Sequence, residues 1–342
     1  MRILIIGGTA FVGRHITEAA LGAGHDVTLF NRGRTGPDLF PQATNLTGDR
    51  NSDLSALVEG QWDATIDVCA YFPRQVHELA AVLGAGDGQT GRGGHHIFVS
   101  SMSAYRTPVA RGFREDAALA ENTDPDATEI TEQNYGGLKV DCERAATELY
   151  GEQHTAIVRP TYVIGPHDRS YRMTYWVERI AAGGTVLAPG DQDAPIQIID
   201  ARDMATWIVG LAERAVTGPF NAVSPTPPFG FGALLAAITE AVAPEGTKLV
   251  WVSNDFLEAQ EVSETSLPLW PGGDPESDIN AANPAAATAT GLRPRPLDQT
   301  VREIHAAELA HPRAVKPDVG LTQELEAELL SRWAASQPTA GA

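Results

Sequence analysis

The residues best suited to do chemistry are a tyrosine and a lysine four positions apart, Tyr135 and Lys139. In a helix, this spacing places both side chains on one face. An ammonium beside a phenol favours the phenolate, which lowers the tyrosine pKa from about 10 toward neutrality. A tyrosine with such a pKa can give or take a proton at a hydroxyl or carbonyl group. The pair therefore predicts an acid/base site.

A run of serines and a methionine, residues 100–103, offers a partner for this pair. Ser101 is expected at the carboxyl end of a buried strand, the side of the sheet where ligands bind, and its hydroxyl can polarise a substrate oxygen there. Ser103 is the second choice for that role. A tyrosine four residues before a lysine is common by chance, so the prediction depends on the elements that position it.

Those elements begin at the N-terminus with an apolar run, residues 2–6, which reads as a strand buried on both faces. Glycines follow, and helical apolar spacing starts at Phe11. Backbone amides in such a turn, together with the N-terminus of the next helix, bind a pyrophosphate. Gly7 suits a tight turn and Gly13 a close approach of helix and strand, whereas Ala10 stands where a middle glycine is usual. The turn residues expected to bind a dinucleotide are Gly7, Thr9, Ala10, Phe11, Val12 and Gly13.

Apolar strands and helical patterns then alternate over about 160 residues, which predicts an α/β fold with a doubly wound parallel sheet. We expect a dinucleotide-binding Rossmann domain over residues 1–164, to which strands near 196–200 and 219–223 return. Beyond residue 164 the alternation breaks. A smaller substrate-binding lobe is expected over residues 165–195 and 224–342.

The strand ends supply further cofactor residues. An NAD site usually has an acid after the second strand, whereas an arginine there accommodates a 2′-phosphate. Asn31 is neutral and Arg32 and Arg34 follow it, so the sequence favours NADP(H) and keeps NAD(H) as the alternative. The residues expected in the same site after the third and fourth strands are Asp49, Arg50, Cys69, Ala70 and Tyr71.

Composition narrows the class of protein. The net charge of -19 opposes non-specific binding to nucleic acid or an anionic membrane. The 2 cysteines exclude a disulfide framework, and His95-His96 have no third ligand near them, so no metal site is expected. No apolar run approaches the ~20 residues of a membrane span, and the N-terminus lacks a signal peptide, so a cytoplasmic protein is expected.

The motifs together resemble the extended and atypical short-chain dehydrogenases/reductases, in the branch described as NAD-dependent epimerase/dehydratase-like. They are the turn at residues 7–13, Val99-Ser100-Ser101, Tyr135-Gly136-Gly137-Leu138-Lys139, residues 159–166 and Asp200-Ala201-Arg202-Asp203. The resemblance implies that Tyr135 is the acid/base, that Lys139 lowers its pKa and holds the ribose, and that Ser101 binds the reacting oxygen. It further implies a homodimer formed through the helices at residues 73–83 and 131–150, and cofactor contacts from Ser100, Pro160 and Val163.

Several positions depart from the family pattern. Ala10 replaces a glycine, as in atypical members, some of which have lost catalysis. Thr161 and Gln197 stand where nucleotide-sugar enzymes of the family often carry an asparagine and an arginine, and Met102 does not supply the acid expected of a dehydratase. The candidate substrate residues besides Ser103 are Tyr162, Arg169, Arg172 and Gln197, the two arginines as partners of an anionic group.

The leading interpretation is an NAD(P)-dependent oxidoreductase that transfers a hydride at a hydroxyl or carbonyl carbon of a small molecule. One alternative is a nucleotide-sugar epimerase with a tightly held cofactor, since net and internal redox use the same core residues. A second alternative is a non-catalytic relative that senses the cofactor or binds RNA, because fold alone does not settle function.

Overall fold

The computed structural model describes residues 1–263, 266–270, 278–313 and 317–337. The chain divides into two compact units. Unit 1 comprises Met1–Val163, Ile198–Thr226 and Ser277–Pro294, and unit 2 comprises Ile164–Gln197, Pro227–Glu276 and Arg295–Ala342. Residues 278–294 thus belong to unit 1, whereas we expected them in the substrate lobe. The reason is apolar packing, because Ala287 and Leu292 are buried in the core of unit 1 around helix α8 (Ala285–Ala289).

Unit 1 is built on a seven-stranded sheet in which all neighbouring strands are parallel. The strand order is β10 (Gly218–Ala222), β6 (Thr155–Pro160), β5 (His95–Val99), β4 (Ala64–Asp67), β1 (Arg2–Ile6), β2 (Asp26–Asn31) and β3 (Thr44–Thr47). The direction of winding reverses between β1 and β4, and ligands of such sheets bind outside the carboxyl ends of the strands at that point. The doubly wound parallel sheet predicted from the sequence is confirmed.

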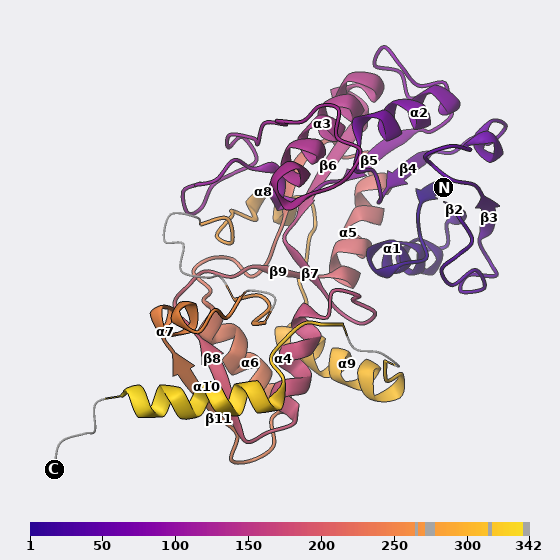
Figure 1. Cartoon of the computed structure of the whole chain (residues 1–342). Coiled ribbons are helices and arrows are strands. Elements are labelled where there is room, and N and C mark those ends of the chain that lie inside the picture. Colours follow the sequence, from indigo (N-terminus) through magenta and orange to yellow (C-terminus); the bar gives the residue numbers. More distant parts are fainter. Residues whose placement is uncertain (264–265, 271–277, 314–316, 338–342) are drawn as a thin grey trace. The chain divides into compact units, whose positions relative to one another are not determined.

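Helices cover both faces of this sheet (Figure 1). Alternate β1 side chains point to opposite faces, so Ile3 and Ile5 enter one core and Leu4 and Ile6 the other. The helices of the first face are α1 (Phe11–Gly22) and α5 (Ala201–Glu213). The helices of the second face are α2 (Pro73–Leu83) and α3 (Glu132–Tyr150), the long helix that carries Tyr135 and Lys139.

Shorter elements complete the strand connections. A 3-10 turn, Ser55–Leu57, lies between β3 and β4 in the chain, and others follow at Met102–Ala104 and Glu152–His154. The expected strand near residues 196–200 is β9 (Ile198–Asp200), which pairs with β7 (Tyr162–Ile164) in a separate two-stranded sheet. Only β10 of the two returning strands therefore joins the main sheet.

Unit 2 combines one pair of strands with helices. Its parallel strands are β8 (Thr185–Pro189) and β11 (Lys248–Val252), which sequence analysis did not predict. Helix α4 packs against α6 and α9, and the buried Trp176 ring meets Phe231 edge-on at 5.6 Å between centroids. The helices of this unit are α4 (Arg172–Ala181), α6 (Phe231–Val242), α7 (Asn254–Ala259), α9 (Leu297–Ala310) and α10 (Gln323–Ser336).

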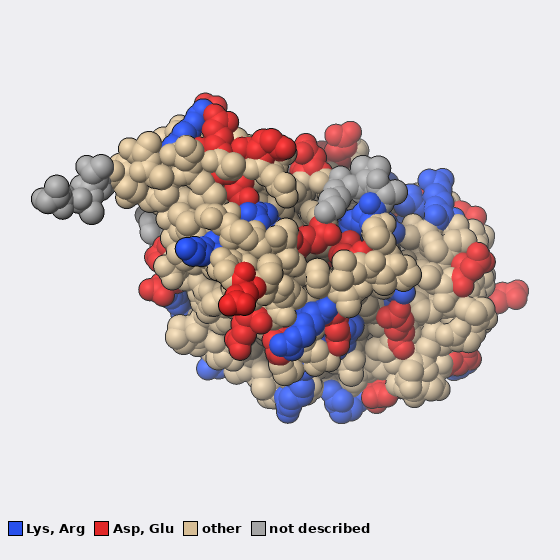
Figure 2. All heavy atoms as spheres, turned by 90° about the horizontal axis from the view of Figure 1, so that it is seen from below, with Lys and Arg blue, Asp and Glu red and all other residues tan. Residues whose placement is uncertain are grey.

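Charges of both signs are mixed on one face of the molecule (Figure 2). On the face seen in Figure 2, Asp and Glu side chains are interspersed with Lys and Arg. Among the described residues, no helix combines the length and the apolar character needed to cross a membrane.

Candidate active site

The turn after β1 has the geometry of a loop that approaches a phosphate. Gly7 has a φ of 111°, a backbone conformation that favours glycine. A Cβ on Gly13 would lie 2.7 Å from the backbone nitrogen of Gly8, so only glycine lets the first turn of α1 come this close to the loop. Ala10 has a φ of -121°, extended backbone that alanine adopts without strain. The missing middle glycine therefore requires no change of the backbone.

A buried threonine ties this loop to its helix. The Thr17 hydroxyl lies 2.9 Å from the carbonyl oxygens of both Gly8 and Gly13, and Thr17 is fully buried. The first backbone N–H groups of α1 have no partner within the helix and are therefore available to a ligand. The loop thus fits the diphosphate of a dinucleotide.

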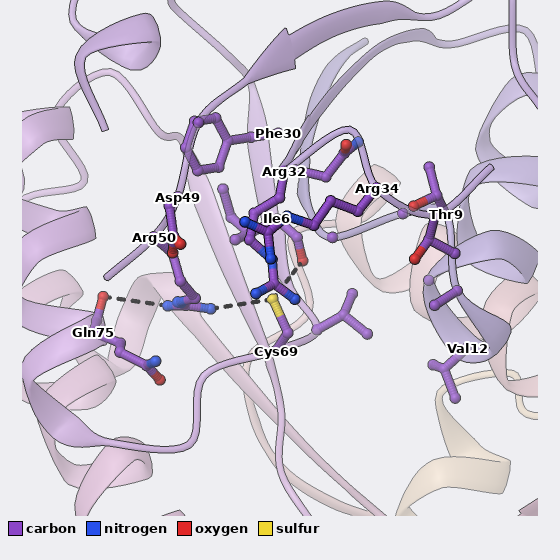
Figure 3. A pocket seen from close by; sticks show the side chains of 18 of the residues that line it. Ile6, Thr9, Val12, Phe30, Arg32, Arg34, Asp49, Arg50, Cys69 and Gln75 are labelled. Carbon is purple, nitrogen blue, oxygen red and sulfur yellow. Dashed lines mark hydrogen bonds between the residues drawn. The ribbon is translucent and has the colours of Figure 1, made fainter. Parts of the chain in front are cut away.

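A cavity of about 490 Å³ opens beside the turn and is lined by residues of unit 1 alone (Figure 3). The predicted cofactor residues that line it are Gly7, Thr9, Ala10, Phe11, Val12, Gly13, Asn31, Arg32, Arg34, Asp49, Arg50, Cys69 and Tyr71. Lining residues that sequence analysis missed include Ile6, Phe30, Asn51, Val68 and Gln75.

Gln75 is a missed residue that a sequence signal identifies. It stands third in α2, which begins with Pro73, and this is the pattern of a helix N-terminus with a capping side chain. Its Oε1 accepts from the backbone N–H groups of Tyr71 and Phe72 at 2.7 and 3.1 Å, and its Nε2 donates to Asn51 Oδ1 at 2.7 Å. Gln75 therefore fixes the wall of the cavity after β4.

The end of β2 carries the charge expected of a 2′-phosphate site. The Asn31 side-chain oxygen accepts from the backbone N–H of Gly33 at 2.8 Å, which shapes the turn. Arg32 and Arg34 follow on the exposed rim, and Figure 3 shows both beside Asp49. The Asn51 backbone N–H first, and then the two guanidiniums, hold the pKa of Asp49 below its usual range. Two cations and one carboxylate thus share this end of the cavity.

Arg50 lies in the cavity wall, where it was expected, but its guanidinium already forms an ion pair within the protein. Its guanidinium pairs with both oxygens of Asp67, at 2.7 and 2.9 Å, and also donates to the Gln75 carbonyl at 3.2 Å. Burial opposes a charged Asp67, but Arg50 outweighs burial and holds the pKa of Asp67 below its usual range. Arg50 therefore acts as part of the wall rather than as a free cation for a ligand. Sequence analysis did not single out Asp67.

Lys139 is held at a fixed point between two strands. It is 2% exposed, and its ammonium donates to the carbonyl oxygens of Val99 and Ala70 at 2.7 and 2.9 Å. Burial lowers the pKa of Lys139 to about 8, because desolvation disfavours the charged form. The lysine therefore still carries its charge at neutral pH and is close to losing it.

Tyr71 joins this lysine and Tyr135 to the cavity. Its ring centroid lies 6.5 Å from that of Tyr135 and 5.5 Å from Lys139 Nζ, and Tyr71 lines the cavity. Burial, with a smaller contribution from Tyr135, raises the pKa of Tyr71, so its phenol keeps its proton. Tyr135 and Lys139 are not among the residues that line the cavity, and each lies near it through its contact with Tyr71.

The consecutive serines after β5 point to different places. The Ser101 oxygen accepts from the Ser103 backbone N–H at 3.1 Å, and its hydroxyl donates to Ser103 Oγ at 3.2 Å. Ser101 thereby caps the turn Met102–Ala104. Ser100, expected to contact the cofactor, is buried and its hydroxyl donates to Glu143 on α3. The structure therefore does not bring the Ser100 hydroxyl into the cavity.

The remaining predicted residues are dispersed. Ala70 and Pro160 are buried, and Val163 packs against the core of unit 1, so none of them lines the cavity. Tyr162 lies in β7. The candidate substrate residues that belong to unit 2 are Arg169, which is exposed, Arg172 and the buried Gln197.

The described part of the chain contains no set of side chains that could coordinate a metal ion. No group of three or more His, Cys, Asp or Glu side chains lies close enough together there to hold an ion. His96 is fully buried and stacks on Tyr150 with 4.0 Å between ring centroids, which places it in the core.

The chain is similar in sequence or in fold to several known proteins. A profile of the NAD dependent epimerase/dehydratase family matches residues 3–223. The chloroplast stem-loop binding protein of 41 kDa b from Arabidopsis thaliana is 26% identical over 241 residues, which cover 64% of this chain and 58% of that protein. UDP-glucuronic acid 4-epimerase from Bacillus cereus, solved with NAD, has a TM-score of 0.64 at 14% identity, over 91% of this chain and 100% of that one. A human epimerase family protein solved with NADPH has a TM-score of 0.61 at 18% identity, and the match covers 90% of this chain and 99% of that one.

The two solved structures share the fold of this chain. The profile spans most of unit 1, including the glycine turn, the serines after β5 and the Tyr135–Lys139 pair. It confirms the resemblance read from these motifs. The chain belongs to the NAD dependent epimerase/dehydratase family.

Proposed function

We propose that the protein is an NADP(H)-preferring oxidoreductase that acts on a hydroxyl or carbonyl carbon of a small molecule. The observation that carries the proposal is the cavity of unit 1. There the glycine turn and the two arginines after β2 line one space, and Tyr71 connects that space to Tyr135 and Lys139. A dinucleotide needs a diphosphate site at one place and a reacting group at another, and this arrangement supplies both.

The chain's own groups have separate tasks in this proposal. When bound, the nicotinamide supplies or takes up the hydride. Tyr135 gives a proton to the substrate oxygen during reduction and takes it back during oxidation. The Lys139 ammonium, charged below a pH of about 8, stabilises the phenolate that Tyr135 becomes. The Ser101 hydroxyl donates to the same substrate oxygen and orients it, with Ser103 as the second choice.

Preference for the phosphorylated cofactor rests on charge at the end of β2. Arg32 and Arg34 line the cavity, and no acid occupies the last position of β2, where Asn31 already accepts from Gly33. A guanidinium binds a phosphate through charge-assisted hydrogen bonds, whereas a ribose 2′-hydroxyl gains little from two cations. The relative solved with NADPH shows that this fold accepts that cofactor.

A nucleotide-sugar epimerase is the first alternative. The relative from Bacillus cereus acts on a UDP-sugar, and an epimerase uses the same acid/base pair with a cofactor that stays bound. Gln197, where such enzymes often carry an arginine for the diphosphate, argues against a nucleotide sugar. Cofactor that survives purification, and no net turnover of added NADPH, would favour the epimerase.

Stem-loop binding without catalysis is the second alternative, favoured by the name of the Arabidopsis relative. Nucleic-acid binding depends on cations that neutralise phosphates. This chain has 44 acidic and 25 basic residues, and the face in Figure 2 mixes both signs. A gel-shift experiment with a hairpin at low salt decides this alternative, since binding there would overturn the expectation of no nucleic-acid partner.

A homodimer through α2 and α3 remains part of the proposal. These helices pack on each other on one face of the sheet. Light scattering of the purified protein gives its mass in solution and tests the dimer directly.

The proposal is tested first by thermal-shift titration with NADPH, NADP, NADH and NAD in parallel. A ligand that binds only the folded state raises the midpoint by an amount that grows with its concentration over its dissociation constant. We expect clear shifts with the phosphorylated pair and small ones with the other. Equal shifts with all four cofactors would contradict the NADP(H) preference inferred from Arg32 and Arg34. The absence of a shift with any of the four would contradict the proposal as a whole.

A further inference from the structure

A buried ion pair lies behind the serine segment, and the proposed reaction does not use it. Glu143 and Arg159 are 5% and 4% exposed. Arg159 Nε donates to Glu143 Oε1 at 3.0 Å and its terminal nitrogen donates to Oε2 at 2.7 Å, so the pair is bidentate. Burial opposes the charge of Arg159, but the hydrogen bonds that Arg159 donates to Glu143 outweigh burial and raise the pKa of Arg159. Arg159 therefore stays charged inside the protein.

This pair holds the serine segment at both of its ends. At the start of the segment, the Ser100 hydroxyl donates to Glu143 Oε1. At its end, Tyr105 OH accepts from Arg159 at 2.8 Å and donates to Asn221 Oδ1 at 2.6 Å. Ser101 and Ser103 lie between these two attachment points. The position of both candidate serines thus depends on one ion pair.

The same pair belongs to the helix that carries the tyrosine. Tyr135, Lys139 and Glu143 follow one another at intervals of four residues in α3, which places them on one face. Lys139 donates to the Val99 carbonyl and Glu143 accepts from the Ser100 hydroxyl, so two successive turns of α3 bind the last residue of β5 and the residue that follows it. Ser101 is the next residue. The distance between Ser101 and Tyr135 is therefore set through Lys139 and Glu143.

We propose that Glu143 and Arg159 are positioning residues that hold the Ser101 hydroxyl at a fixed place relative to Tyr135. A buried ion pair is weak evidence for stability, because an apolar pair of similar volume often stabilises a fold as well. Its bidentate geometry, in contrast, fixes orientation as apolar contacts do not. The inference rests on the proposed function, since it assigns the pair to the reaction of Ser101 and Tyr135.

Two variants separate positioning from folding. Ser100→Ala removes one attachment and leaves the ion pair intact. The double variant Glu143→Leu/Arg159→Met replaces the pair by apolar side chains, which is expected to keep the protein folded. The matched control is Glu326→Gln, which weakens the buried pair of Glu326 with Arg179, 2.6 Å apart in unit 2. The serine segment belongs to unit 1.

Hydrogen exchange measured by mass spectrometry reads the attachment directly. The amides of Ser103, Ala104 and Tyr105 are hydrogen-bonded to Ser101 Oγ, the Ser101 carbonyl and the Met102 carbonyl, each at 3.1 Å. In both test variants we expect exchange of these amides to rise roughly tenfold, with the rest of unit 1 unchanged. The control variant is expected to leave them unchanged. Unchanged exchange in both test variants, or a rise across the whole of unit 1, would overturn the proposal.

Turnover supplies the second readout, with a carbonyl compound found by screening for NADPH oxidation. In both test variants kcat is expected to fall roughly tenfold while the NADPH-induced thermal shift stays that of the wild type. Unchanged kcat together with faster exchange would also overturn the proposal. The exchange measurement needs no cofactor or substrate. A wild-type protein that binds none of the four cofactors would therefore count against the proposed function, while exchange alone would still decide whether the pair holds the serines.

Discussion

The cofactor cavity and the region around Tyr135 lie in one unit but are built by different means. The cavity is formed by a glycine turn at the N-terminus of α1, by a wall that includes Gln75 and Arg50, and by a rim of exposed arginines. Buried side chains shape the other region, where Lys139, Glu143 and Arg159 bind strand ends and each other. The two regions meet at Tyr71. We therefore expect variants of the first region to change cofactor affinity and variants of the second to change turnover.

Each region also contains one buried arginine–carboxylate pair, and the two pairs differ in their surroundings. Arg50 and Asp67 stand in the wall of the cavity, whereas Arg159 and Glu143 join α3 to the serine segment. Both are bidentate. The comparison shows that a buried arginine beside a site need not bind a ligand, because its terminal nitrogens already donate to groups within the protein.

The largest expected effect separates the two regions most clearly. Tyr135→Phe removes the proton donor and keeps the ring, so kcat is expected to fall by about 100- to 10,000-fold. The NADPH-induced thermal shift should remain unchanged, since the phenol takes no part in the glycine turn. NADPH oxidation with an active carbonyl compound measures kcat, and the thermal-shift titration measures cofactor binding. Unchanged turnover would remove Tyr135 from the mechanism.

Lys139 allows a test that needs no substrate. Its pKa is about 8 in the folded protein against an ordinary 10.5, so between these values the unfolded chain binds a proton that the folded chain has released. The free energy of unfolding should therefore rise with pH from about 8 to about 10.5, by about 3 kcal/mol relative to Lys139→Met. Below pH 8 the difference between the two proteins should stay constant. Urea unfolding at several pH values measures it, and parallel pH curves would contradict the lowered pKa.

Local patterns in the sequence predicted the parallel sheet of unit 1 and many of the residues that line the cavity. The run at residues 2–6, the glycines after it and the arginines after Phe30 are neighbours in sequence, and each follows from local rules. The pairs Arg50–Asp67 and Glu143–Arg159 join residues 17 and 16 positions apart on different elements. No spacing rule predicts them, because such contacts depend on which strands become neighbours in the sheet.

Ser100 shows the same limit at the level of one residue. The sequence places it at a strand end beside Ser101, and neighbouring residues of a strand point to opposite faces. Only the position of Glu143 on α3 decides that Ser100 turns to the ion pair. In unit 2, β8 and β11 were missed because their partners lie more than sixty residues apart, beyond any short-range pattern.

Arginine variants test the rim of the cavity. Arg32→Ala and Arg34→Ala each remove a cation that we expect to bind the 2′-phosphate, so the dissociation constant of NADPH should rise about tenfold. That of NADH should hardly change. Arg144→Ala is the matched control, since Arg144 is exposed on α3 and does not line the cavity. Equal losses for NADPH and NADH would show that the arginines bind the diphosphate instead.

The smallest expected effect concerns Asp49, the one carboxylate on the same rim. Arg32 and Arg34 both lower its pKa, so it lies within electrostatic reach of the expected phosphate site and opposes an anion there. Asp49→Asn keeps the shape and an acceptor for the Asn51 backbone N–H, now 3.0 Å from Oδ1. We expect about threefold tighter NADPH binding at low salt, a smaller gain at high salt, and no change for NADH. Weaker binding of both cofactors would mean that the carboxylate itself binds the adenosine part of the dinucleotide, and the rim would then join the cavity wall as a site of direct contacts.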